Sequence, residues 1–283
     1  MSEALVNVEN LRIGFAGEGG TVAEAVKGVS FSVGREKLGI VGESGSGKSL
    51  SSRALMGVLP GHAHVAADAM SFAGIDLLTA SPRVRRQLRG NRMGMILQDP
   101  KFSLNPVMRV GAQIAEAIRL GDRSLPRAKV RRKVLEILEA VHIRAPERVC
   151  DLYPHELSGG MGQRVMIAMM VVREPELLIA DEPTSALDVT VQAQVLEIMD
   201  ELVRRRGMGL VFISHDLNLV SRFCDRVLVM YAGRIVETLD ARRMHEAAHP
   251  YTQGLLACLP AIDGPLTPLP TLARAASWGE ARP

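Results

Sequence analysis

The sequence predicts an α/β fold with a mainly parallel sheet, and three observations lead to that prediction. Short apolar runs alternate with helical segments over the second half of the chain. A glycine-rich loop stands between an apolar run and a helical segment in the first half, and a long helical stretch separates the two regions. The 283 residues, 47% of them hydrophobic, suffice for one large domain or one domain with an insertion.

The N-terminal region predicts two strands and then a strand, loop and helix. Leu5–Phe15 alternates apolar and polar residues in part and predicts a strand, and Ala25–Val33 predicts a second. Gly17–Gly20 predicts the turn between them. Leu38–Val41 is a short apolar run directly before the glycine-rich loop, and Leu50–Val58 after the loop suits a helix.

The middle of the chain is expected to be mainly helical. Ile75–Asn91 is rich in arginine, which fits either a nucleic-acid patch or a solvated helix face. The formal net charge of only +3 and the 4% of aromatic residues favour the solvated face. Met93–Leu97 predicts a buried strand. From Phe102 to Val172 the pattern is helical, as in Val130–Val141, and predicts a helical insertion.

Strands are expected again after the insertion. Leu177–Ala180, Leu210–Ile213 and Val227–Met230 are apolar runs of strand length. Val191–Arg205 and Leu217–Cys224 are helical segments between them. Alternation of this kind predicts a mainly parallel sheet with helices on both faces.

The chain changes character after Pro250. Prolines at positions 260, 265, 268 and 270 predict an extended tail with little core of its own. The three cysteines, Cys150, Cys224 and Cys258, are scattered and predict neither a disulfide framework nor a zinc site. The longest apolar run, Val165–Val172, is far shorter than the roughly 20 residues that span a bilayer, so work at a membrane would need partner subunits.

The glycine-rich loop Gly42–Ser49 fits the pattern G-x-x-x-x-G-K-S. Glycines let backbone N–H groups turn inward around phosphates, and the following helix presents its positive end to them. Lys48 is expected to reach the β- and γ-phosphates, and the Ser49 hydroxyl is expected to bind Mg²⁺. The loop therefore predicts a nucleoside triphosphate site, for ATP above all.

Two carboxylates follow the apolar run 177–180. Asp181 is placed to hold Mg²⁺ through water, and Glu182 is placed to orient or deprotonate the attacking water. The alternative is an ordinary strand end with solvated acids, which would be favoured if the chain had no phosphate loop.

A second glycine-rich element, Leu157–Arg164, opens a helical run. Its N–H groups and the helix dipole can bind a phosphate. Ser158 can equally be the N-cap of that helix, with the glycines forming the turn, and both roles can hold together.

Five motifs occur in the order found in the ATP-binding cassette (ABC) transporter ATPases, which the chain resembles from about Leu5 to Met244. The resemblance implies a P-loop NTPase (RecA-like) core with an antiparallel β subdomain and an α-helical insertion at about 101–173. It implies a nucleotide-binding domain over 1–245 and a short C-terminal extension, 246–283, typical of peptide importer ATPases. The motifs are Gly42–Ser49, Leu157–Arg164, Ala180–Pro183, Ser185–Asp188 and Ser214–Asp216.

The resemblance also implies a site shared by two subunits stacked head to tail. Each ATP would lie on the phosphate loop of one subunit and on the signature Leu157–Gly160 of the other. Ser158 and Gly160 would then contact the γ-phosphate in trans. Asp188 resembles the D-loop residue that crosses the seam between the subunits.

Three further residues gain expected roles from the same resemblance. Gln98 resembles the Q-loop glutamine that reaches Mg²⁺ and water, and His215 resembles the switch histidine beside Glu182. Phe15 stands where these ATPases carry an aromatic that stacks on adenine, and a strand-core role for it is equally open. The expected catalytic residues are Glu182, His215 and Gln98; the nucleotide-binding residues are Phe15, Gly42, Glu43, Ser44, Gly45, Ser46, Gly47, Lys48, Ser49, Leu50, Ser158, Gly159, Gly160 and Asp188; the Mg²⁺ residues are Ser49, Gln98 and Asp181.

Several stretches narrow the resemblance to importer ATPases for di- and oligopeptides and for nickel. Peptide is the first expected cargo, and nickel or another chelated metal is the second. Many members have a longer tail with clustered cysteines, whereas this tail has only Cys258, so we expect no iron–sulfur cluster. The stretches are Gln98–Pro100, Phe102–Pro106, Tyr153–Met161, Thr184–Gln194 and His249–Leu256.

The resemblance implies a peripheral protein at the cytoplasmic face of the cell (inner) membrane. Expected partners are a second ABC ATPase subunit, identical or related, two transmembrane permease subunits and, indirectly, an extracytoplasmic solute-binding protein, but no nucleic acid. A soluble ABC ATPase of DNA repair would carry a long coiled coil, for which the interval Ser49–Leu157 is too short, and translation versions carry two cassettes. An exporter subunit is disfavoured only by the branch-specific stretches. A regulatory ATP-binding module is disfavoured by the intact Glu182, Gln98 and His215.

Overall fold

Residues 4–16, 22–98, 103–185, 187–259 and 278 are described by a computed structural model. The chain divides into two units: unit 1 takes residues up to Ala80 and from Val211 onward, and unit 2 takes Ser81–Leu210. The predicted turn Gly17–Gly20 lies outside the described residues. Both units contain strands and helices, as the α/β prediction requires.

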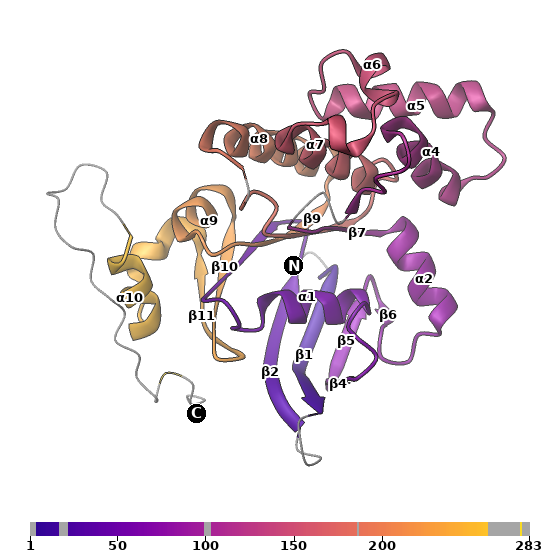
Figure 1. Cartoon of the computed structure of the whole chain (residues 1–283). Helices are drawn as coiled ribbons and strands as arrows, with labels where there is room; N and C mark the ends of the chain where they lie inside the picture. Colours follow the sequence, from indigo (N-terminus) through magenta and orange to yellow (C-terminus); the bar gives the residue numbers. More distant parts are fainter. Residues whose placement is uncertain (1–3, 17–21, 99–102, 186, 260–277, 279–283) are drawn as a thin grey trace, which may run out of the picture. The chain divides into compact units, whose positions relative to one another are not determined.

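An antiparallel sheet forms the first part of unit 1 (Figure 1). Its strand order is β2-β1-β5-β6, and β4 pairs with β1 on the same sheet. The two long strands were predicted, but the three short ones were not, because none of the three is a continuous apolar run and β4 is mostly exposed. The strands are β1 (Val6–Ala16), β2 (Val22–Val33), β4 (Ala63–Ala66), β5 (Ala69–Phe72) and β6 (Ile75–Asp76).

The rest of unit 1 holds parallel strands and the helices next to them. Strand β3 (Lys37–Val41) runs parallel to β10 (Arg226–Tyr231), which pairs antiparallel with β11 (Arg234–Asp240). Helix α1 (Lys48–Met56) begins two residues before its predicted start and ends at Gly57, whose φ of 63° allows a left-handed C-cap. Strand β9 (Gly209–Ile213) begins in unit 2 and ends in unit 1. The other described helices of unit 1 are α9 (Leu217–Phe223), the 3₁₀ helix η3 (Ala241–Glu246) and α10 (Pro250–Ala257).

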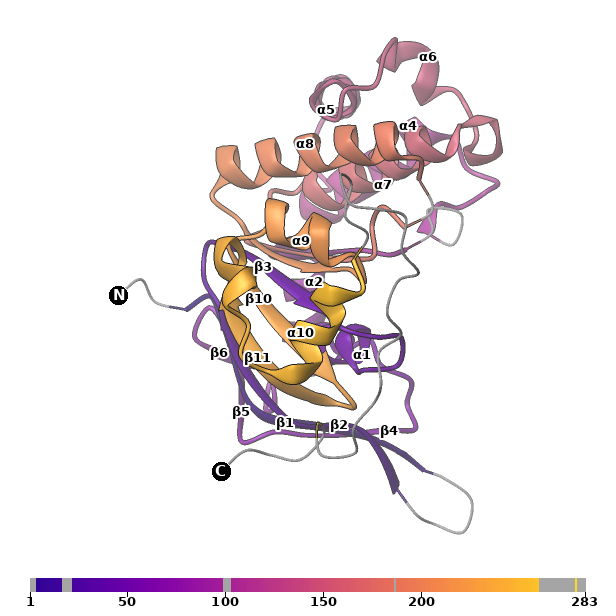
Figure 2. The ribbon, with the colours of Figure 1, turned by 90° about the vertical axis from the view of Figure 1, so that its left-hand side faces the viewer.

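Unit 2 consists of a parallel strand pair and the predicted helices. Strand β7 (Met93–Ile96) pairs with β8 (Leu177–Asp181), and every residue of β8 is buried. Both views place helices α7 and α8 side by side (Figure 2). The helices are α2 (Pro82–Asn91), α4 (Val110–Gly121), α5 (Arg127–Ala140), α6 (Pro146–Cys150), the 3₁₀ helix η2 (Pro154–Glu156), α7 (Gly159–Val171) and α8 (Val189–Arg206).

The extended tail predicted after Pro250 is wrong for its first turns, because helix α10 forms there. Proline is compatible with the first turn of a helix, where its missing N–H is not needed, and His249 Nδ1 accepts a hydrogen bond from the Tyr251 N–H as the N-cap. The prolines that motivated the prediction lie at 260–270, outside the described residues. In the described part of the chain, no helix is both long enough and apolar enough to cross a membrane.

Candidate active site

The glycine-rich loop joins β3 to α1 in unit 1, and two of its glycines, Gly42 and Gly47, lie in close packing. Gly42 has φ 149°, and a Cβ at this position would lie 2.1 Å from the carbonyl oxygen of Met230. Gly47 has φ 99°, and its Cβ would lie 3.0 Å from Val26. A side chain at Gly42 would therefore collide with the backbone of β10, which fixes glycine at this point.

Lys48 is buried at the start of α1, with 6% of its surface exposed. Its ammonium donates hydrogen bonds to the carbonyl oxygens of Gly42 and Glu43, at 2.8 and 2.7 Å, and to Ser46 Oγ at 3.4 Å. A buried charge needs such partners to offset its desolvation. The cation therefore lies within the loop, where the sequence predicts the phosphates.

Two contacts from distant segments hold the loop from outside. The Gly233 N–H, in the turn between β10 and β11, donates to the carbonyl oxygen of Ser46 at 3.2 Å. The Glu43 N–H donates to the hydroxyl of Tyr251 on α10 at 3.0 Å. Sequence reasoning missed both anchors, and Tyr251 was used only as a marker of the importer branch. The available signal was its hydroxyl, since a buried tyrosine usually finds a hydrogen-bond partner.

His215 lies in unit 1 on the connection between β9 and α9, and its side chain is exposed. The Ser214 N–H donates to the carbonyl oxygen of Ile40 at 3.2 Å, which ties this connection to the strand that leads into the phosphate loop. Asp216 then caps α9 through the N–H of Leu219 at 3.0 Å. His215 is thus held between two anchored neighbours.

Phe15 lies near the end of β1 in unit 1. It is half-buried, and its ring packs against His62 with 5.7 Å between the ring centroids. Its backbone pairs with Ala23 and Ala63 on the neighbouring strands. This partial burial fits both the adenine-stacking role and the strand-core alternative.

The acidic pair stands at the end of β8 in unit 2. Asp181 is 4% exposed, and Glu182 follows it with φ 50°, a left-handed conformation that non-glycine residues adopt at a cost. The Gln98 side-chain amide donates to Glu182 Oε2 at 3.4 Å. The Ser185 hydroxyl donates to the Glu182 carbonyl oxygen at 3.2 Å. The structure therefore brings the predicted base together with the predicted Q-loop glutamine.

The signature residues stand at the start of α7, and Asp188 stands at the start of α8. Ser158 Oγ accepts a hydrogen bond from the Met161 N–H at 3.3 Å, which confirms its predicted N-cap role. Asp188 Oδ1 accepts from the Val191 N–H at 3.0 Å and caps α8. A Cβ on Gly160 would lie 2.5 Å from Val191, so the two helix starts are in close contact. Ser158 is exposed at this end of unit 2.

The candidate residues thus form two sets, each organised within its own unit. Unit 1 supplies the phosphate loop with Leu50, Phe15 and His215, and unit 2 supplies the others. The residues expected to bind Mg²⁺ offer a hydroxyl from Ser49, an amide from Gln98 and a carboxylate from Asp181. Such oxygen donors fit this hard cation.

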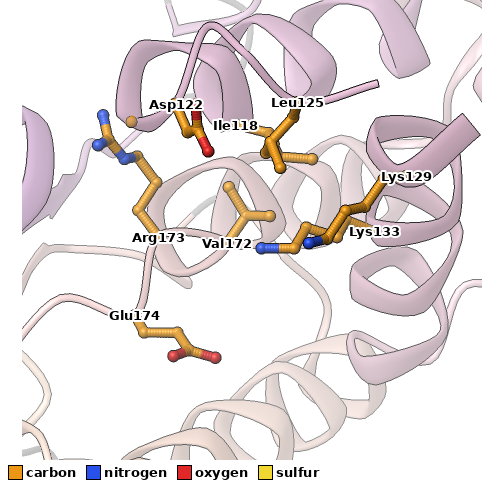
Figure 3. A pocket seen from close by; sticks show the side chains of 9 residues that line it. Ile118, Asp122, Leu125, Lys129, Lys133, Val172, Arg173 and Glu174 are labelled. Atoms are coloured by element: carbon orange, nitrogen blue, oxygen red, sulfur yellow. The ribbon is translucent and has the colours of Figure 1, made fainter. Parts of the chain in front are cut away.

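A cavity of about 340 Å³ lies elsewhere in unit 2, between the ends of α4 and α7 and the start of α5 (Figure 3). Lys129 and Lys133 extend from α5 into it. Hydrogen bonds from Ser124, followed by the charges of the two lysines, lower the pKa of Asp122 on its rim. The lining residues of this cavity are not candidate site residues.

Comparison with known proteins gives one family. Residues 26–185 match the family model described as "ABC transporter". The chain is 49% identical over 259 residues to the dipeptide transport ATP-binding protein DppD of Haemophilus influenzae, covering 91% of this chain and 78% of that protein. It is 45% identical over 262 residues to the oligopeptide transport ATP-binding protein OppD of Bacillus subtilis, covering 92% and 73%.

Solved structures agree with this match. CbiO1 from Clostridium perfringens, described as part of the ABC transporter complex CbiONQ, is similar with a TM-score of 0.74 at 27% identity, over 87% of this chain and 92% of that one. The ATP-binding cassette MJ0796, in a dimeric post-hydrolysis state bound to ADP and Pi, has a TM-score of 0.72 at 25% identity, over 84% and 99%.

Proposed function

Because this chain belongs to the ABC transporter family, we propose that it is the ATP-hydrolysing subunit of a transporter that imports peptides. The hydrolytic part rests on one observation above all, the contact of 3.4 Å between Gln98 and Glu182 at the end of β8. It places a polar amide against the carboxylate that the mechanism needs as a base. An ordinary strand end with solvated acids would not require this partner.

In the proposed mechanism the phosphate loop binds the triphosphate and Glu182 activates water. Lys48 turns donors toward phosphate oxygens, while the carbonyl oxygen of Gly42 keeps its ammonium within the loop. Glu182 takes a proton from the attacking water, while Gln98 holds that carboxylate in place. His215 contacts the γ-phosphate and senses its loss. Mg²⁺, held by Ser49, Gln98 and Asp181, would supply charge stabilisation on the phosphates.

A second subunit completes the proposed site. Ser158, Gly159 and Gly160 would contact the γ-phosphate bound to the other subunit, and Asp188 would lie at the seam. Support comes from the exposure of Ser158 and Asp188, which leaves both starts of α7 and α8 accessible to a partner. Because the γ-phosphate contacts exist only in the closed pair, ATP favours closure, and hydrolysis favours reopening.

The cargo and the other partners follow from the relatives. DppD and OppD are named for dipeptide and oligopeptide transport, which favours peptide over nickel. The proposed assembly contains two permease subunits and a solute-binding protein, with this chain at the cytoplasmic face of the membrane. Residues 1–245 would form the nucleotide-binding domain, with its helical insertion at about 101–173, and 246–283 the extension.

Uptake measurements test the cargo. Cells that lack this chain should lose uptake of radiolabelled dipeptide and regain it when the chain is supplied in trans. Uptake of radioactive nickel in the same strains is the matched comparison. Loss of nickel uptake with unchanged dipeptide uptake would replace peptide by nickel as the cargo.

The dependence of ATPase rate on protein concentration tests the shared site. The rate per chain should rise as dilute monomers associate, because one subunit lacks half of the site. Full activity in a strictly monomeric preparation would contradict the proposal.

A further inference from the structure

The peptide group between Gly42 and Glu43 is held from both sides. Its N–H donates to the Tyr251 hydroxyl at 3.0 Å, and its carbonyl oxygen accepts from the Lys48 ammonium at 2.8 Å. A trans peptide is planar, so its N–H and C=O point in opposite directions and turn together. Whatever fixes the direction of the N–H therefore also fixes the direction of the oxygen that Lys48 contacts.

Tyr251 is itself fixed by its surroundings. Its side chain is fully buried, and its ring packs against Tyr231 and Trp278, with centroid distances of 4.5 and 5.9 Å. The N-cap His249 accepts from the Tyr251 N–H at 3.1 Å. One oxygen of Glu237 on β11 accepts from the N–H groups of Ala248 and His249, at 2.6 and 3.1 Å, and so holds the start of α10. Figures 1 and 2 show α10 beside β11.

Strand β10 also holds the loop, at Gly42, which is next to the residue held by Tyr251. Tyr231 follows Met230 on β10, and the Met230 carbonyl oxygen is the atom that a side chain at Gly42 would meet. The Tyr251 ring thus packs on the same strand that backs the loop. The tyrosine hydroxyl and the β10 backbone hold neighbouring points of the loop, and only one of them depends on α10.

We propose that Tyr251 is a positioning residue for the phosphate loop, so that helix α10 takes part in nucleotide binding. The hydroxyl sets the Gly42–Glu43 peptide plane, and the plane sets the carbonyl beside which the Lys48 ammonium rests. This gives the extension after residue 245 a role within its own subunit. The inference rests on the proposed role of the phosphate loop.

The test compares two tyrosine-to-phenylalanine variants of the full chain. Tyr251→Phe keeps the ring and removes only the oxygen that accepts from Glu43, and it should weaken ATP binding by roughly tenfold. Tyr231→Phe is the matched control, because its hydroxyl makes no hydrogen bond to another described residue, and ATP binding should be unchanged. The dissociation constant for ATP and the separate kcat and KM values are measured.

The ATP dissociation constant and KM, compared with the melting temperature, distinguish positioning from a purely structural role. A positioning role should raise the dissociation constant and KM more than it changes kcat. A structural role would lower the melting temperature of Tyr251→Phe and leave the ATP dissociation constant of the folded protein unchanged, and that result would overturn the inference. If Tyr251→Phe does not fold, His249→Ala supplies the test, because it loosens the start of α10 without altering the tyrosine. Its ATP binding should also weaken, and wild-type binding would again overturn the inference.

Lys48→Ala separates this inference from the proposed function. If Lys48→Ala binds ATP like the wild type, the phosphate loop itself is misassigned. If Lys48→Ala loses binding and Tyr251→Phe does not, only the role of Tyr251 is wrong.

Discussion

The phosphate loop and the signature segment are both glycine-rich turns that open a helix, yet they differ in how they are held. The loop is anchored by distant segments: Gly42 lies against β10, Ser46 accepts from Gly233, and Glu43 donates to Tyr251. The signature is held by nearby segments of unit 2, since Ser158 caps α7 and Gly160 packs against Val191 of α8, and Ser158 itself is exposed.

This difference indicates two kinds of binding surface. A loop whose groups are packed and oriented within one unit can bind a ligand on its own, because little ordering remains to be done. An exposed helix start can bind an anion on a second subunit when the two subunits meet. The predictions below test this contrast, beginning with the largest expected effect.

Glu182→Gln should lower the ATPase rate by a factor of about 10²–10⁴ and leave ATP binding intact. The amide keeps the shape of the side chain beside Gln98 but cannot accept a proton. Binding should persist because the phosphate loop lies in unit 1 and keeps all its contacts. Single-turnover hydrolysis and equilibrium ATP binding are measured on the same preparation, and an unchanged rate would remove Glu182 from its assigned role.

Gly42→Ala and Gly160→Ala should fail in different ways. The added methyl group at Gly42 meets a backbone oxygen at 2.1 Å, so we expect ATP binding by the isolated chain to weaken by more than about tenfold. At Gly160 the nearest atoms to the methyl group belong to the Val191 side chain, at 2.5 Å, so binding by the isolated chain should remain and the multisubunit ATPase rate should fall.

A second substitution provides the control for this pair. Val191→Ala shortens the side chain that faces Gly160 and should restore activity to Gly160→Ala, whereas no side-chain change can relieve the backbone contact at Gly42. Equal loss of ATP binding in both glycine variants would abolish the contrast between loop and signature.

The sequence predicted the segments whose pattern is local and regular. Leu177–Ala180 is a continuous apolar run that becomes most of the fully buried strand β8, and Ser158 is a capping residue that caps its predicted helix. Helix α10 escaped prediction because prolines further along the chain suggested an extended segment, while Pro250 itself suits a first helical turn.

The anchors of the phosphate loop could not be predicted, since they join residues far apart in sequence. Glu43 and Tyr251 are 208 positions apart, and no local pattern specifies that their backbone and hydroxyl meet. The glycines of the loop were predicted from the need for backbone N–H groups to face phosphate. The structure adds a second reason, which is the approach of Met230 to Gly42.

The role of Asp188 as the N-cap of α8 can be separated from its proposed role at the seam between the subunits. Asp188→Ala removes the N-cap of α8 and should lower the free energy of unfolding by about 1 kcal/mol. Asp188→Asn keeps a good capping group and should stay within about 0.5 kcal/mol of the wild type. Chemical denaturation measures both. If the asparagine variant is stable but its ATPase rate falls, the carboxylate acts beyond capping; equal stability of the two variants would contradict the capping contact.

The cysteines should show the smallest response, and they probe the packing behind the phosphate loop. Cys224 lies against Gly39 of β3, where a Cβ would be 3.1 Å from its sulfur. Burial raises the pKa of the Cys224 thiol to about 12, so that at pH 8 only about one molecule in 10⁴ carries the reactive thiolate. Cys258 is half-exposed by comparison. Iodoacetamide at pH 8 should therefore modify Cys258 and leave Cys224 untouched in the native protein, with peptide mass spectrometry as the measurement and urea-unfolded protein as the control. Labelling of Cys224 at the rate of Cys258 would mean that β3 opens readily behind the loop, and the loop would then be no better anchored than the signature.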